Sequence, residues 1–237
     1  MTPEPFQISD PDPDGDLEGA LSRTDPDRWL SSRFAAGEAA RRALVAIYAF
    51  DNELGRAPRA ASTPIVAEMR LAWWREALEE IRSGVPVRRH PVALALNAAA
   101  GEHHLDPAQL ETLIDARLRE LDPRPMTLEE ALEWAEGTGG TCARLAAAVL
   151  DPGCDSQAAG AGGAAWSIGR LILTAGLSAE AAQMALETRL RQARGVTAAA
   201  FPAIAHAALA RARAKGRRAS PLGDRLRLMR AVLAGRV

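Results

Sequence analysis

Apolar residues recur at helical spacing in two neighbouring stretches of the chain, 41–54 and 64–84. The first stretch carries its apolar positions at Leu44, Ile47, Tyr48 and Leu54. The second stretch has the same spacing at Ile65, Met69, Ala72, Trp73 and Glu76. A period of 3.6 residues predicts two helices, which bury these stripes against each other.

Helical spacing continues along the chain, and capping residues set the boundaries. Pro64 and Gly84 bracket one helix, Asp106 is an N-cap, and Thr127 with Glu130 forms a capping box. The glycine-rich stretch 160–165 is predicted to be a flexible lead into a helix. We predict helices over 26–57, 64–83, 91–101, 107–121, 127–150 and 165–173, followed by amphipathic segments at 179–193, 197–214 and 222–234. No strand-like alternation occurs, so we expect an all-α, single-domain bundle of about seven or eight helices.

Composition divides the chain into two parts. The chain has 237 residues and 48% hydrophobic content, which is enough for one sizeable core. Residues 1–25 are acidic and rich in proline, a composition typical of a disordered arm. We therefore expect an arm at 1–25 and one helical domain at 26–237.

Charge and cysteine content narrow the possible partners. A formal net charge of −1 gives no general basis for binding nucleic acid. Cys142 and Cys154 lack metal-site spacing, and we expect reduced thiols in a cytoplasmic protein. No apolar run approaches the roughly 20 residues of a membrane span. A basic stretch such as 211–218 is usually a solvated helix end. The alternative is that it contacts an acidic partner or lipid headgroups, which would place the protein at the periphery of the inner membrane.

An unusual run, Trp73-Trp74-Arg75-Glu76, lies at the centre of the second predicted helix. Consecutive residues of a helix point about 100° apart, so the two rings cannot share one face. The simplest interpretation places Trp73 in the core and Trp74 at its rim, beside a solvated ion pair. The alternative makes Trp74, Arg75 and Glu76 a binding surface.

Several short motifs occur in an order that resembles the squalene/phytoene synthase family, the head-to-head prenyl-diphosphate transferases of the all-α isoprenoid synthase fold. The motifs are Phe34, Arg42, Tyr48-Ala49-Phe50, the arginine-and-tryptophan helix, His90-Pro91-Val92, Leu113-Ile114-Asp115-Ala116-Arg117 and Trp134-Ala135-Glu136-Gly137-Thr138-Gly139-Gly140. The resemblance covers most of 29–177. It implies an isoprenoid-synthase-like bundle that is shortened at its C-terminal end.

The resemblance also implies where metal ligands should stand. Family members bind Mg²⁺ through two aspartate-rich helical motifs, because a hard cation needs carboxylate oxygens. In this chain Gly55 and Arg59 occupy aspartate positions of the first motif, and Leu173 and Leu177 occupy those of the second. No carboxylate occurs between Asp155 and Glu180. The sequence therefore predicts no metal site and no catalytic residue.

These losses indicate a non-catalytic family member, a pseudoenzyme that acts as a binding or assembly factor. The segment 49–54, with Arg70 and Trp74-Arg75, resembles a degenerate branch that includes the mitochondrial complex I assembly factor, so we expect a protein partner and a role with a respiratory complex. The candidate binding residues are Arg42, Tyr48, Asp51, Glu53, Arg70, Trp74, Arg75, Glu76, Trp134 and Trp166.

Two alternatives stay open at this point. An active Mg²⁺-dependent prenyl transferase would need Asp51 with Glu53, or Glu76 with Glu80, as relocated ligands. A carrier of an isoprenoid or prenyl diphosphate would need Arg42 or Arg70 to hold the headgroup. The sequence does not decide whether the cavity is open or filled by Trp134 and Trp166.

Overall fold

The computed structural model describes residues 16–172, 179–216 and 220–237. These residues form helices and turns with no strand. The α-helices are α1 Leu17–Thr24, α2 Pro26–Ser32, α3 Glu38–Ala60, α4 Pro64–Ser83, α5 Pro91–His103, α6 Pro107–Leu118, α7 Leu128–Ala135, α8 Thr141–Leu150, α9 Ser156–Leu171, α10 Ala179–Gln192, α11 Ala210–Ala214 and α12 Pro221–Ala234. Short helical turns between them are η1 Arg119–Leu121, η2 Glu136–Gly140, η3 Ala193–Gly195, η4 Phe201–Ala203 and η5 Ala205–Leu209. The all-α prediction is confirmed.

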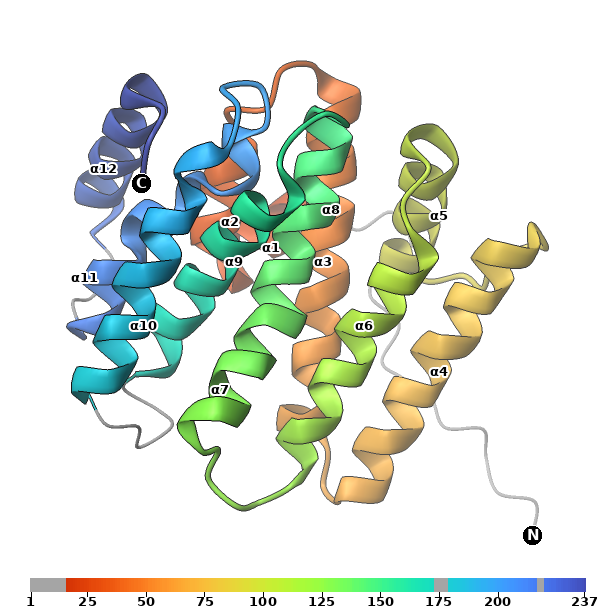
Figure 1. Cartoon of the computed structure of the whole chain (residues 1–237). Helices are drawn as coiled ribbons and strands as arrows, with labels where there is room; N and C mark the ends of the chain where they lie inside the picture. Colours follow the sequence, from red (N-terminus) through yellow and green to blue (C-terminus); the bar gives the residue numbers. More distant parts are fainter. Residues whose placement is uncertain (1–15, 173–178, 217–219) are drawn as a thin grey trace, which may run out of the picture.

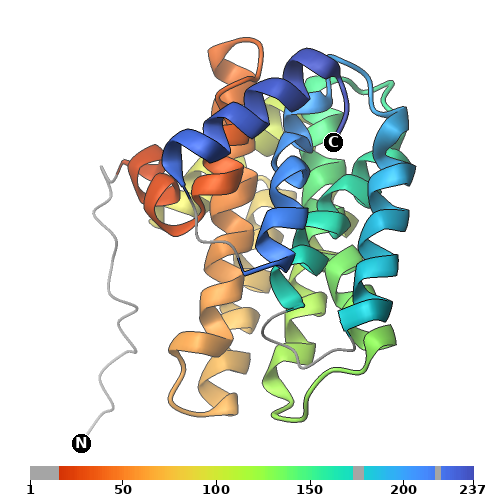
Figure 2. The same cartoon turned by 90° about the vertical axis from the view of Figure 1, so that its left-hand side faces the viewer.

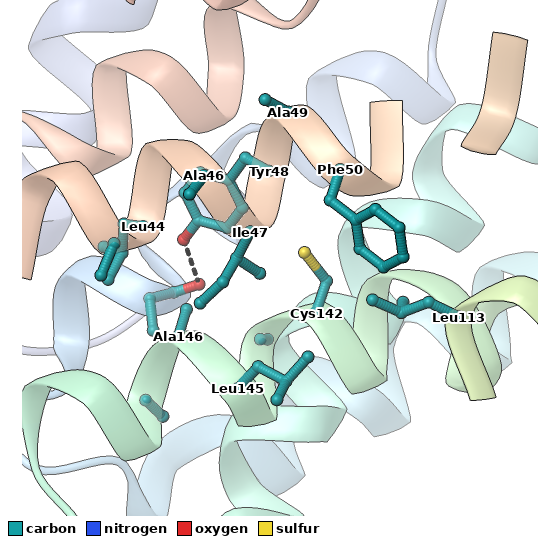
Figure 3. Packing of buried hydrophobic residues seen from close by; sticks show 14 of the residues in the cluster. Leu44, Ala46, Ile47, Tyr48, Ala49, Phe50, Leu113, Cys142, Leu145 and Ala146 are labelled. Atoms are coloured by element: carbon teal, nitrogen blue, oxygen red, sulfur yellow. Dashed lines mark hydrogen bonds between the residues drawn. The ribbon is translucent and has the colours of Figure 1, made fainter. Parts of the chain in front are cut away.

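Helix α3 lies in the middle of the bundle, with α4, α5, α6 and α8 around it (Figure 1). Every residue from Ala43 to Asp51 is buried, because neighbours cover the helix on all sides. Figure 3 shows Ile47, Tyr48 and Phe50 among the side chains that pack between α3 and α8. The helix continues through Pro58, where the sequence predicted its end. Pro58 lies in the last turn of α3, so the backbone hydrogen bond that it cannot donate is lost at the end of the helix and not in its middle.

The first described residues differ from the expected arm. Residues 17–24 form helix α1, which begins with an N-cap bond from the amide of Gly19 to Asp16. Leu21 is buried in the main core, and Asp25 is buried and caps α2. The prediction of disorder is therefore wrong for 17–25. Leu21 packs into the core, and Asp25 is both the C-cap of α1 and the N-cap of α2, so the segment is attached to the bundle. Residues 1–15 lie outside the described part of the chain.

Helix α4 has the predicted boundaries but buries a different face. Pro64 is at its start, and Gly84 ends it in the left-handed conformation with φ 66°. The buried residues are Ala67, Leu71, Trp74, Ala77 and Leu78. Ile65 and Met69 are 68% and 56% exposed, so the predicted stripe is wrong. The order of the tryptophans is also reversed, because Trp74 is in the core and Trp73 is only partly buried.

The predicted helix 127–150 is present as α7, the π-helical turn η2 and α8, and the Thr127 capping box is confirmed. Helix α9 packs against η2, α8, α10 and α11. It begins at Ser156, so the expected flexible lead at 160–165 is wrong. A Cβ on Gly163 would overlap the carbonyl oxygen of Gly139. The glycines therefore allow two helical backbones to touch, which stabilises the helix through packing despite poor propensity.

The C-terminal region is less regular than its sequence pattern. The amphipathic segment 197–214 forms η4, η5 and α11 rather than one helix, whereas α10 and α12 lie close to the ranges of the other two segments. Figure 2 shows α12 crossing the face of the molecule that is turned toward the viewer. In the described residues no helix combines the length and the apolarity that a membrane crossing requires.

Candidate functional site: an arginine-lined cavity

A cavity of about 510 Å³ opens beside the C-terminal half of α3. Its walls come from segments that are far apart in the sequence: the α1–α2 junction, α3, α6 with η1, the loop 122–126, α7 with η2, and α9. The charged lining consists of Arg28, Arg59, Arg117, Arg119, Arg124 and Arg170 against Asp25, Asp51, Glu120 and Asp122. Six arginines and four carboxylates give this lining a formal charge of +2.

A buried ion-pair network forms one wall of the cavity. Asp51 accepts from Arg28 Nη1 at 2.7 Å and from Arg117 Nη2 at 2.5 Å, one arginine on each carboxylate oxygen. Arg28 also donates through Nε to Asp25 at 2.6 Å, and Arg117 through Nη1 to Glu120 at 2.6 Å. Burial alone would raise the pKa of Asp51, but the Arg117 and Arg28 guanidinium groups hold it well below its usual range. The Asp51 carboxylate is therefore ionised and fully engaged by arginine.

Two tryptophans stack on these arginines. Trp166 has the Arg28 guanidinium at 4.7 Å and the Arg170 guanidinium at 4.6 Å from its ring centroid. Trp134 has Arg117 at 5.3 Å, and its Nε1 donates to Glu120 at 2.9 Å. Such cation–π contacts fix flat guanidinium groups in place. The tryptophans line an open cavity rather than filling it.

Part of the positive charge is left without a partner. Among the described residues Arg59 makes no hydrogen bond or ion pair within contact distance, although it lies in the field of Glu120 and Asp51. Burial lowers the pKa of Arg59 below its usual value; the carboxylates of Glu120 and Asp51 oppose this shift, whereas Arg117 and Arg170 act in the same direction as burial. The Nε atoms of Arg117 and Arg119 are buried donors with no acceptor. An unsatisfied buried donor costs about 1–3 kcal/mol, but neither Nε atom is accessible from the cavity. Arg59 is exposed and lines the cavity, so its guanidinium is the group that an anionic ligand can reach.

Magnesium does not fit the described residues of this site. Gly55 offers no ligand, and a Cβ there would lie 3.2 Å from Arg117 Nη1. Arg59 places a cation where the family resemblance implies a carboxylate. Within the described ranges no group of three or more His, Cys, Asp or Glu side chains is arranged to hold a metal. Leu173 and Leu177, the positions of the second motif, lie outside the described residues.

The relocated ligands of the transferase alternative are held by arginines instead. Glu53 pairs with Arg56 at 2.7 Å. Glu80 pairs with Arg88 at 2.7 Å, and Glu76 lies 3.3 Å from the same guanidinium group. Neither Glu76 nor Glu80 lines the cavity.

The structure brings only some of the sequence candidates to one place. Asp51, Trp134 and Trp166 line the cavity, together with Gly55 and Arg59. The other candidates lie elsewhere: Arg42 pairs with Glu38 on the surface, Tyr48 is buried in the core, Arg75 pairs with Asp115, and Arg70 lies on α4 outside the cavity. 

The expected binding surface at Trp74 is wrong for that side chain. Trp74 is 5% exposed and packs edge-on against Phe50 and His90. Only Arg75 and Glu76 of this group reach solvent.

Sequence reasoning missed Arg28, Arg117 and Arg170 as site residues. Arg117 ends the family motif that begins at Leu113, and Arg170 lies in the helix that lacks carboxylates. The sequence therefore contained a weak indication that these two arginines belong to the site. For Arg28 it contained none, because its partner Asp51 is 23 residues away.

The fold has close counterparts among solved structures. A dehydrosqualene synthase crystallised with a ligand superimposes with a TM-score of 0.67 at 14% identity, over 92% of this chain and 94% of that one. The squalene synthase HpnC from Alicyclobacillus acidocaldarius gives a TM-score of 0.58 at 16% identity, over 92% and 93%. The protein therefore has an isoprenoid-synthase-like fold. The expected C-terminal shortening relative to longer synthases stays a prediction.

Sequence comparison identifies the family within that fold. The profile of the squalene/phytoene synthase family matches residues 21–237, and the chain belongs to this family. Complex I assembly factor 6 of NADH dehydrogenase (ubiquinone) is also similar, at 30% identity in Mus musculus and 28% in Homo sapiens over 131 residues. That match covers 55% of this chain and 39% of the relatives, so the chain spans about two fifths of their length.

Proposed function

We propose that this protein is a non-catalytic member of the squalene/phytoene synthase family that acts as an assembly factor for a respiratory NADH dehydrogenase. The similarity to complex I assembly factor 6 supports the assembly role. The arginine-lined cavity supports the absence of metal-dependent transfer, and it is the observation that carries the proposal.

The argument against transfer is electrostatic. Ionisation of a prenyl diphosphate needs cations that neutralise the leaving group, and the family uses Mg²⁺ for this. In this cavity the only deeply buried carboxylate on α3, Asp51, already neutralises two guanidinium groups. A divalent cation beside Arg59 would be repelled by its guanidinium, and the nearby Glu120 carboxylate is already bound to Arg117.

The cavity suits a binding role in which arginines replace the metal. Arg59, which is exposed and lines the cavity, offers charge-assisted hydrogen bonds to phosphate or carboxylate oxygens. We propose that the cavity holds an anionic group without a metal, either on a ligand such as a prenyl diphosphate or on the partner protein. No cofactor is required in this proposal.

Calorimetric titration of the full chain with farnesyl diphosphate and with inorganic diphosphate, each with and without Mg²⁺, tests the cavity. We expect binding that does not need Mg²⁺ and that weakens at least tenfold in Arg59→Gln, because a charged hydrogen bond contributes about 1.5–3 kcal/mol. Arg56→Gln, an exposed arginine one turn earlier, is the control. Mg²⁺-dependent binding, or release of diphosphate with time, would establish the transferase alternative.

The assembly role needs a test in the source organism. We expect deletion of the gene to lower the amount of assembled NADH dehydrogenase, and the chain itself to restore it. A deletion strain with normal NADH dehydrogenase and altered isoprenoid products would contradict the proposal.

A further inference from the structure

Helix α12 presents an apolar stripe to solvent. Its buried side is formed by Asp224, Leu228 and Ala231, which pack on the rest of the bundle. The opposite side carries Leu222, Leu226, Met229 and Leu233, which are 47–84% exposed. At about 100° per residue, these four side chains fall within roughly 60° of one another around the helix axis. The helix is therefore apolar on two opposite faces, and only one of them is covered by the described residues.

Unpaired positive charge flanks this stripe. Arg225 and Arg230 lie on its two sides, both are exposed, and neither makes an ion pair within the described residues. Asp224 is the one carboxylate of α12, and it is turned inward, where it binds Arg227 at 3.0 Å and Arg213 at 2.9 Å. The outer face of α12 therefore combines leucines with a net positive charge.

Two described arginines of the basic stretch that the sequence suggested for lipid contact are neutralised by carboxylates. Arg211 pairs with Glu187 at 2.8 Å, and Arg213 pairs with Asp27 and Asp224. Residues 217–219 lie outside the described residues. In this part of the molecule the described basic residues without an ion pair include Lys215 in the stretch and Arg225 and Arg230 on α12.

A second copy of this chain is a poor occupant for the stripe. The spacing of four, three and four residues is that of a heptad seam, with Arg225 and Arg230 in the flanking positions. In a parallel pair Arg225 would face Arg230 of the other copy, and an antiparallel pair would set each arginine against its own equivalent. The seam also spans less than two heptads, whereas stable coiled coils need three or four.

An anionic lipid surface matches the same features. An interfacial helix needs one apolar face a few residues long, with arginines at its edges that reach lipid phosphates. Helix α12 has 14 residues, about 21 Å, and lies on an outer face of the bundle, as Figures 1 and 2 show. We propose that α12 is a membrane-docking helix, which places Leu222, Leu226, Met229 and Leu233 in the interface of an anionic bilayer. This inference is independent of the function proposed for the cavity.

Vesicle flotation with the full chain tests the proposal. One set of vesicles contains phosphatidylcholine alone, and the other contains phosphatidylcholine with phosphatidylglycerol. We expect flotation only with the anionic vesicles, and loss of it at high salt, because exposed charges are screened.

Two pairs of variants separate the apolar and the charged contributions. Leu226→Gln/Met229→Gln should lose most of the binding, while Ile65→Gln/Met69→Gln, the exposed apolar pair on α4, should retain it. Arg225→Gln/Arg230→Gln should weaken binding on the order of tenfold or more, and Arg56→Gln/Arg82→Gln, which removes the same charge elsewhere, should not. Thermal unfolding of each variant verifies the fold.

Three results would overturn the proposal. They are no flotation of the wild-type chain with anionic vesicles, equal flotation of the α12 and α4 variants, and concentration-dependent dimerisation that Leu226→Gln/Met229→Gln abolishes. The last result would assign the stripe to a protein contact.

Discussion

Replacement of Asp51 by asparagine tests whether this residue is a structural counter-ion or a metal ligand. Asparagine keeps the shape of the side chain and removes its charge. Arg28 and Arg117 are then left buried with one fewer carboxylate between them. Each keeps a second partner, Asp25 for Arg28 and Glu120 for Arg117, so neither charge is wholly uncompensated.

The expected loss follows from that geometry. Breaking a buried ion pair costs about 3–5 kcal/mol, and the remaining partners place Asp51→Asn at the lower end, about 3 kcal/mol. For a chain of this size each kcal/mol corresponds to about 2–4 °C, so the midpoint of thermal unfolding should fall by about 6–12 °C. Asp115→Asn is the matched control, because the pair of Asp115 with Arg75 is exposed. It should cost less than about 1 kcal/mol.

The pH dependence gives a second signature. The folded pKa of Asp51 is held well below its unfolded value, so the ion pairs contribute stability at neutral pH. That contribution is lost as the pH falls below about 4, where the unfolded carboxyl takes up a proton first. Urea unfolding across this range should show a steeper decline in the wild-type chain than in Asp51→Asn.

Two outcomes would refute this reasoning about Asp51. The first is an Asp51→Asn variant within about 1 kcal/mol of the wild-type chain at neutral pH, since the ion pairs would then contribute nothing measurable. The second is stabilisation of the wild-type chain, but not of the variant, by added Mg²⁺. That result would make Asp51 a metal ligand and would restore the transferase alternative.

Further predictions concern packing and thiol reactivity. Gly163→Ala should destabilise the chain by about 3 kcal/mol, because its Cβ meets the backbone of Gly139. Gly101→Ala has open space around it and should stabilise α5 by about 0.5–1 kcal/mol. Urea unfolding measures both variants, and equal effects on stability would contradict the close helix crossing. Burial raises the pKa of Cys142 to about 12, so a thiol reagent should label Cys154 in the native chain and Cys142 only after unfolding. Native labelling of both cysteines at one rate would show that the core around α3 opens.

Local signals predicted the boundaries of several helices. Pro64 and Gly84 set the ends of α4, and the capping box at Thr127 sets the start of α7, because these residues act on backbone groups within one turn. The family was also identifiable from short motifs, and the profile match over 21–237 confirms it. The identities of Gly55 and Arg59, at positions where the resemblance implies carboxylates, are likewise a property of the sequence alone.

Tertiary packing decided which face of each helix is buried. Helix α4 has apolar residues on two faces, and the sequence pattern favoured the face with Ile65 and Met69. In the structure the face with Leu71 and Trp74 packs on the bundle instead. Periodicity identifies apolar faces, but the neighbouring helices determine which of them is covered.

The candidate site shows the same difference between what the sequence determines and what the tertiary structure determines. The sequence by itself determined an all-α member of the family with Gly55 and Arg59 where the resemblance implies carboxylates, because fold pattern and residue identity are local properties. Only the tertiary structure brought Arg28 and Arg117 to Asp51 across 23 and 66 residues and left Arg59 without a partner among the described residues. Charges pair according to distance and burial in space, and neither quantity can be read from separation along the chain.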